Sequence, residues 1–121
     1  MSDALFRRIL WVSAAFNFSA AFVFAFPASS LGQLVSLPAD VPAVYSAMVA
    51  LFVALFGGAY GWLALQPVIH RPLLWFGAIG KSAVVVLAVI LCIAGEIPMR
   101  LAAVSIGDLV FAAIYVKWLL K

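Results

Sequence analysis

Four long apolar segments separated by proline-containing connections form the pattern of this chain. They run approximately over residues 4–26, 43–65, 73–94 and 99–120. Each is close to the roughly 20 residues that a helix needs to cross a hydrocarbon core about 30 Å thick. Prolines stand in all three connections, where they suit a loop or a helix start and not a helix interior. The pattern predicts an all-α protein with four transmembrane helices.

The first connection, residues 27–42, is the only long one. It carries a short apolar patch among Ser, Gly and Gln, typical of a short helix or turn that lies in the membrane interface on the non-cytoplasmic side. The apolar run after Arg8 is longer than the usual apolar core of a signal peptide, so we expect a retained first span. A chain of 121 residues is too short for two independent cores. We therefore expect one transmembrane domain over residues 1–121, built as a four-helix bundle.

Composition supports an integral membrane protein. Hydrophobic residues make up 69% of the chain and charged residues only 9%, against roughly 45–50% and about 25% in soluble domains. The formal net charge of +3 comes from basic residues that stand singly or in pairs beside apolar runs. A nucleic-acid partner would need them clustered on a polar face, so we expect none.

The basic residues instead predict the orientation of the chain. Lys and Arg are retained in cytoplasmic loops, and Arg100 is the only basic residue in the connections on the far side. The side that carries both termini has five: Arg7, Arg8, Arg71, Lys117 and Lys121. All four tryptophans also fall towards that side of their spans, as in an aromatic belt. We expect both termini in the cytoplasm.

One polar residue interrupts each span at a similar distance from these basic anchors. Asn17, Tyr60, Lys81 and Asp108 each lie nine or ten residues from the nearest basic residue on the expected cytoplasmic side or from His70, or about 14 Å into the membrane. This spacing predicts a polar layer near the midplane. Counted from the loop tip near Ile97, however, Lys81 should lie about 7 Å nearer the cytoplasm than Asp108, so the two estimates disagree.

The neighbours on each helix face are small or polar, which favours positions inside the bundle. Lys81 shares its face with Gly77, and Asp108 shares its face with Ala112 and Tyr115. The second span ends in a GxxxG pair, Gly57 and Gly61, and we predict that these glycines and Gly77 pack against other helices. The candidate polar layer is then Asn17, Tyr60, Lys81, Asp108 and Tyr115.

Two interpretations of this layer remain open. In the first, Lys81 and Asp108 form a buried ion pair that only joins two antiparallel helices. In the second, the layer lines a cavity where either group takes up a proton or binds a polar head group, since ionisable residues inside a membrane commonly mark functional sites. The interpretations overlap, because one pair can hold helices together and also face a ligand.

Residues for most enzymatic chemistry are absent from the spans. They contain no His cluster, carboxylate pair, CxxC motif or Ser–His arrangement. His70 lies in a loop without a second ligand near it, and Cys92 is the only cysteine. We therefore predict no catalytic residue, no metal site and no cofactor, and we expect that the protein is not an enzyme.

Three segments resemble a group of small bacterial four-span membrane proteins that are loosely similar to the DoxX family. They are "FGGAYGWLA", "HRPLLWFGAIGKSAVVV" and "GDLVFAAIYVKWL", between Leu55 and Leu120, with the Gly80-Lys81 and Gly107-Asp108 pairs as the most specific elements. The resemblance implies a bundle in the bacterial inner membrane without established enzymatic activity. It also implies an accessory role beside membrane redox enzymes.

Two functions compete at this point. The chain could be a non-enzymatic membrane protein whose polar layer contacts a hydrophobic or amphiphilic ligand or a partner subunit. Alternatively, it could be a small proton-coupled transporter that acts as an oligomer, similar in size and span count to the small multidrug resistance family. That family carries its key glutamate in the first span, whereas the carboxylate here, Asp108, comes in the fourth. We expect a homo-oligomer in either case.

Overall fold

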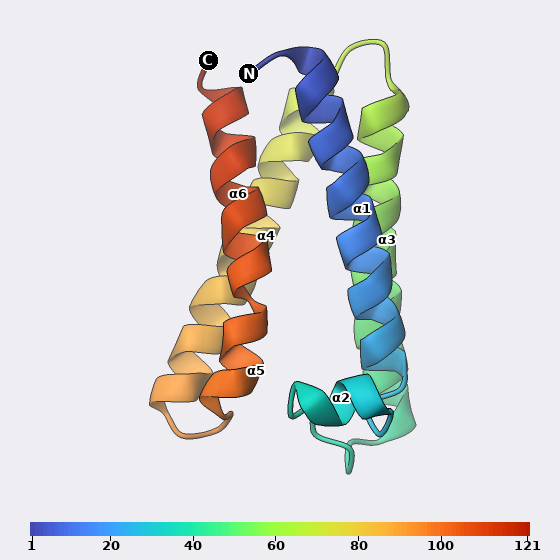
Figure 1. Ribbon diagram of the computed structural model, residues 1–121, viewed down its shortest axis with the longest axis vertical. Coiled ribbons are helices and arrows are strands. Elements are labelled where there is room, and N and C mark those ends of the chain that lie inside the picture. Colours follow the sequence, from blue (N-terminus) through green and yellow to red (C-terminus); the bar gives the residue numbers. More distant parts are fainter. The chain divides into compact units, whose positions relative to one another are not determined.

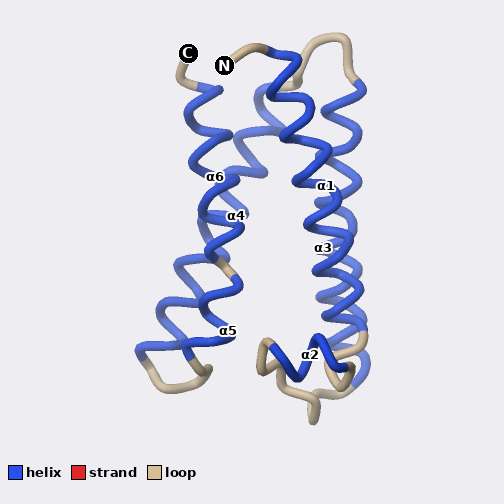
Figure 2. The backbone as a smooth tube through the Cα atoms, in the orientation of Figure 1, coloured by secondary structure: helices blue, strands red, loops and turns tan.

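The computed structural model describes residues 1–121 and contains helices but no strands (Figures 1 and 2). Four helices are long and apolar enough to cross a membrane, the fourth with a break after its first six residues. The predicted all-α fold with four membrane-spanning helices is thus confirmed in its helix content. The elements are α1 (Asp3–Ala25), α2 (Ser30–Leu34), α3 (Ala43–Leu65), α4 (Arg71–Ile93), α5 (Met99–Val104) and α6 (Ile106–Leu119).

The chain divides into two compact units, Met1–Ile69 and His70–Lys121. The first is a hairpin of the antiparallel helices α1 and α3, with the short helix α2 in the connection between them (Figure 1). In the second, α4 runs antiparallel to α5 and α6 (Figure 1). The single transmembrane domain over residues 1–121 stays a prediction.

Close packing in the first hairpin depends on Gly57. A Cβ atom at this position would lie 3.1 Å from the Cβ of Asn17 and 3.3 Å from the carbonyl oxygen of Ala14. Because glycine has no side chain, α3 approaches the backbone of α1 here. Gly61, one turn on, faces the ring of Trp11, which would lie 3.3 Å from an added Cβ. The buried residues of α1 recur every three or four positions, as one helix face requires: Phe6, Leu10, Ser13, Ala14, Asn17 and Ala21.

Arg7 joins α1 to the end of α3, at the end of the hairpin opposite the connection that contains α2. Its guanidinium donates to the carbonyl oxygens of Ala64 at 2.9 Å and Pro67 at 2.9 Å, and also to that of Gln66. The last carbonyls of a helix have no partner within the helix, and they form its negative end. A planar guanidinium with several fixed donors satisfies more of them than an ammonium could. Arg7 therefore caps α3 from the neighbouring helix.

The second hairpin is closed in a similar way. Arg71 donates to the carbonyl oxygen of Leu119 at the end of α6, and its guanidinium lies 5.3 Å from the ring centre of Trp118. The helix α4 begins at Arg71, two residues before the expected span, because His70 caps it. The His70 Nδ1 accepts a hydrogen bond from the backbone N–H of Leu73 at 3.2 Å.

A break at Ser105 divides the fourth span, which the sequence pattern predicted as one helix. The backbone N–H of Ser105 bonds to the carbonyl of Ala102, three residues back, and its hydroxyl donates to the same oxygen at 2.7 Å. This local bonding competes with the helical pattern. The break makes Asp108 a first-turn residue of α6.

A glycine pair tests the close approach of α1 and α3. We expect Gly57→Ala to lower the melting temperature in detergent micelles relative to Gly58→Ala, measured by circular dichroism. Both changes gain similar helix propensity, but only the Cβ at position 57 meets neighbouring atoms, whereas position 58 has nothing within 4 Å. Equal melting temperatures would contradict the packing described.

Two adjacent arginines test the cap on α3. We expect Arg7→Ala to lower the free energy of unfolding by about 1.5–3 kcal/mol, because charged hydrogen bonds to otherwise unpaired carbonyls are lost. Arg8→Ala removes the same charge from an exposed position and should have a much smaller effect. Chemical unfolding in mixed micelles measures both, and the cap is wrong if the two variants unfold alike.

Candidate functional site

An ion pair joins the two spans of the second hairpin near their middle. The Nζ of Lys81 lies 2.8 Å from Oδ1 of Asp108. The Lys81 side chain is only 3% exposed and that of Asp108 is 20% exposed. A separation of 2.8 Å is that of a direct, charge-assisted hydrogen bond. The two ionisable residues of the predicted layer are therefore in contact.

The positions of the two residues along their helices explain how they meet. Lys81 lies ten residues after the start of α4 and Asp108 eleven residues before the end of α6. Measured from the loop, Lys81 is twelve residues from the end of α4 and Asp108 nine from the start of α5. The difference of three residues is about 4.5 Å, which the long lysine side chain covers. This offset lies between the nearly level placement that the basic anchors gave and the offset of about 7 Å that the loop tip gave.

Aromatic rings of α6 continue the site beyond the ion pair. Lys81 Nζ lies 5.3 Å from the ring centre of Phe111, a distance typical of a cation–π contact. The Phe111 ring is tilted by 39° against that of Tyr115, with 6.4 Å between their centres. Phe111 thus lies between Lys81 and Tyr115, which is fully buried. The ammonium lies between a carboxylate and an aromatic face.

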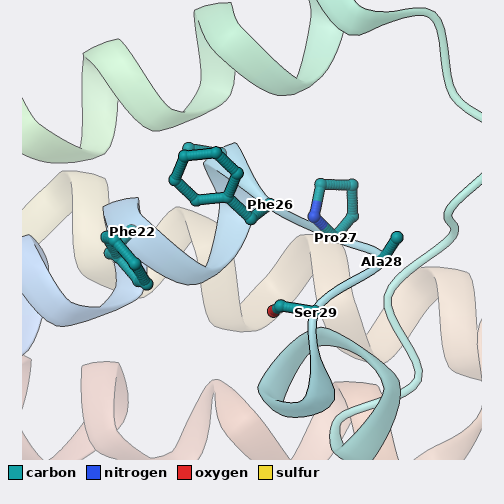
Figure 3. Close-up of a pocket in the computed structure, with 6 residues that line it drawn as sticks. Phe22, Phe26, Pro27, Ala28 and Ser29 are labelled. Carbon is teal, nitrogen blue, oxygen red and sulfur yellow. The ribbon is translucent and has the colours of Figure 1, made fainter.

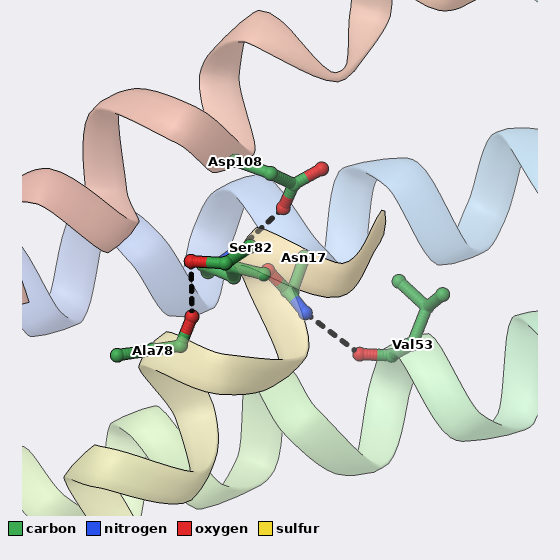
Figure 4. A network of polar contacts seen from close by, with 6 residues as sticks. Asn17, Val53, Ala78, Ser82 and Asp108 are labelled. Atoms are coloured by element: carbon green, nitrogen blue, oxygen red, sulfur yellow. Dashed lines mark hydrogen bonds and ion pairs between the residues drawn. The ribbon is translucent and has the colours of Figure 1, made fainter. Parts of the chain in front are cut away.

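The face of α4 that carries Lys81 is otherwise apolar and small. Leu74, Gly77 and Ala78 are buried on it, at the spacing of one helix face. Ser82 follows Lys81, but its hydroxyl donates to the carbonyl of Ala78 at 2.8 Å within the same helix (Figure 4). The Ser82 hydroxyl is thus bonded within its own helix.

The carboxylate of Asp108 retains an open oxygen. The ion pair uses Oδ1, and Oδ2 accepts no hydrogen bond from the protein. The position of Asp108 in the first turn of α6 also favours its negative charge, because that end of the helix dipole is positive. Chemically, the site can hold a proton or accept a hydrogen bond from a polar group that approaches along the membrane.

The other two predicted residues lie in the first hairpin. Asn17 is 7% exposed, and its Nδ2 donates to the carbonyl oxygen of Val53 at 3.1 Å (Figure 4). Tyr60 is buried, with its ring centre 6.4 Å from that of Phe56. The structure thus joins Lys81 to Asp108 and describes Asn17 and Tyr60 in a separate unit. The common level of all four stays a prediction.

Sequence reasoning missed Phe111 as part of the site. Its position three residues after Asp108 and four before Tyr115 places it on their helix face. That spacing is the signal that could have identified it.

A shallow apolar depression lies at the end of α1 in the first hairpin (Figure 3). Its lining has no charged side chain, and the hydroxyl of Ser29 already accepts the backbone N–H of Gly32 at 3.2 Å. Nothing there directs a polar ligand. The residues are Phe22, Ala25, Phe26, Pro27, Ala28 and Ser29.

No protein-family model, curated protein or solved structure matches this chain.

A double-mutant cycle measures how strongly the pair holds the second hairpin. We expect Lys81→Met or Asp108→Leu alone to cost about 2.5–3.5 kcal/mol, the penalty for one unpaired charge in mid-membrane. The double variant should recover most of this loss, because neither charge remains. Thermal unfolding in lipid nanodiscs provides the comparison. Losses that simply add would show that the pair contributes no coupling.

Proposed function

We propose that this chain is a small, non-enzymatic integral membrane protein that binds an amphiphilic ligand at the Lys81–Asp108 pair. The observation that carries the proposal is the carboxylate of Asp108, which has one oxygen on Lys81 and the other open. A mid-span carboxylate that is 20% exposed would gain from a further hydrogen-bond donor, because water is scarce at that depth.

The chemistry of the site favours a ligand with a hydroxyl or ammonium head group. The open oxygen accepts hydrogen bonds, whereas the ammonium of Lys81 is already buried against Asp108 and Phe111. The ligand body would lie along apolar side chains, which remain exposed on both spans beyond the pair. Examples on the two helices are Val84, Leu87, Val104 and Leu109.

Proton-coupled transport is the second candidate, and the same carboxylate favours it. Asp108 is the only acidic residue near the middle of a span, and Lys81 beside it provides a positive charge that could replace the proton when it leaves. Transport would require this pair to separate during each cycle. Binding requires no such step.

The proposal includes a location in the bacterial inner membrane with both termini in the cytoplasm. The five basic residues at the span ends on the side of both termini support this orientation. An accessory role beside a membrane redox enzyme, as a self-associated DoxX-like protein, is the context that the resemblance of the last three spans suggests. The bilayer itself is the first partner.

Photolabelling tests the proposed binding. The probe is a long-chain alcohol that carries a diazirine in its chain, added to vesicles that contain the protein. We expect Asp108→Asn to reduce labelling of the second hairpin about tenfold, because one charged hydrogen bond of roughly 1.4 kcal/mol is lost. Asp40→Asn removes the same charge from an exposed connection and should leave labelling unchanged.

Equal labelling of the wild-type and Asp108→Asn proteins would contradict the binding proposal. The same vesicles, loaded with a pH-sensitive dye, separate the second candidate from the first. Proton flux that disappears in Asp108→Asn, with no change in labelling, would support transport instead.

A further inference from the structure

We propose that the two hairpins are copies of one structural unit, and that the second copy carries the ligand-binding charge pair where the first has a neutral hydrogen bond. The duplication is independent of the function proposed above. Only the statement that the charge pair binds a ligand rests on that function.

The first helices of the two hairpins correspond with an offset of 64 residues. The segment "RRILWVSAAFN" from Arg7 to Asn17 aligns with "RPLLWFGAIGK" from Arg71 to Lys81. Arg, Leu, Trp and Ala recur at the same four positions of these segments. The buried positions also coincide: Leu10, Ser13, Ala14 and Asn17 in α1 match Leu74, Gly77, Ala78 and Lys81 in α4.

The second helices correspond with an offset of 55 residues. "FGGAYGWLAL" in α3 aligns with "FAAIYVKWLL" at the end of α6. Both begin with a phenylalanine whose ring centre lies 6.4 Å from that of a buried tyrosine one turn later, with ring planes inclined by 45° and 39°. Four of the five buried positions of α3 coincide as well: Gly57, Tyr60, Leu63 and Ala64 match Ala112, Tyr115, Trp118 and Leu119. The fifth, Gly61, corresponds to the half-buried Val116.

The contacts between the helices obey the same two offsets. Arg7 donates to the carbonyl of Ala64, and Arg71 donates to that of Leu119. Chance similarity of apolar helices would not reproduce a long-range capping contact. The offsets differ by nine residues because the second hairpin has a shorter connection, which lacks a helix equivalent to α2.

The contact at mid-span is where the copies differ in chemistry. Asn17 donates to the carbonyl of Val53, and the equivalent residues, Lys81 and Asp108, form the ion pair. Gly57 leaves room for the neutral contact, since an added Cβ would lie 3.1 Å from that of Asn17. One hairpin thus forms with an amide and a carbonyl at this place.

The charges of the second hairpin are therefore not required by its architecture. Two charges in mid-membrane are more costly than one amide, so a purely structural role would be met by the neutral contact. Positions 81 and 108 are the ones at which the second copy is specialised for binding. This favours the functional interpretation of the pair over the purely structural one.

Exchanging the mid-span chemistry of the first copy tests the duplication. The variants are Asn17→Lys, Val53→Asp and the double variant N17K/V53D, compared by thermal unfolding in nanodiscs. If positions 17 and 53 correspond to 81 and 108, each single change lowers the melting temperature and the double variant regains at least half of the summed loss. Losses that add in full would overturn the correspondence.

The reverse exchange tests the specialisation. The variant K81N/D108V/A112G places the residues of the first copy at the equivalent positions of the second. Asn replaces Lys81 as the amide donor, Val replaces Asp108 so that only the backbone carbonyl remains as acceptor, and Gly replaces Ala112. We expect this variant to keep more of the melting temperature than Lys81→Asn alone, and to lose labelling by the diazirine alcohol about tenfold, as Asp108→Asn does. A variant no more stable than Lys81→Asn alone would overturn the duplication.

Thermal stability tests the duplication and photolabelling tests ligand binding, so each proposal can be contradicted without the other. Regained stability in both exchanges with undiminished labelling would leave the duplication in place and overturn the ligand-binding role of the pair. Additive stability losses with abolished labelling would overturn the duplication and leave the proposed function in place.

Discussion

Water is absent from the core of a bilayer, so every charge there needs a partner within the protein. The ion pair of Lys81 and Asp108 is the strictest case in this chain, because both charges lie near the middle of a span. It sets α6 in one register against α4, since a shift by one residue would turn the carboxylate away. That register also brings Phe111 over the ammonium.

The same constraint governs the helix ends. Backbone carbonyls at the end of a helix need donors, and Arg7 and Arg71 supply them from the start of the neighbouring helix. These arginines are among the basic residues that predict a cytoplasmic side. Arg7 and Arg71 thus contribute to helix packing through their donors, in addition to the orientation that their charges predict.

The sequence predicted the four helices because length and apolarity suffice to identify a span. It also predicted the polar residues of the site, since Lys81 and Asp108 are conspicuous among apolar neighbours. It missed contacts made by backbone groups. The carbonyl of Val53 accepts a hydrogen bond from Asn17, and that of Ala64 accepts one from Arg7. Every residue has a backbone carbonyl, so the residue type does not reveal such contacts. The break at Ser105 likewise depends on local bonding that an apolar pattern does not reveal.

The chemistry of the pair restricts the kind of head group it can bind. An anionic head group would have to separate Lys81 from Asp108, which would leave the carboxylate unpaired at a depth where that is costly. A hydroxyl or ammonium needs no such separation, because it donates to the oxygen that Lys81 does not use. The pair would then remain intact and gain a second donor. A ligand site of the proposed kind, built on an existing ion pair, would therefore select donors over anions without moving either helix.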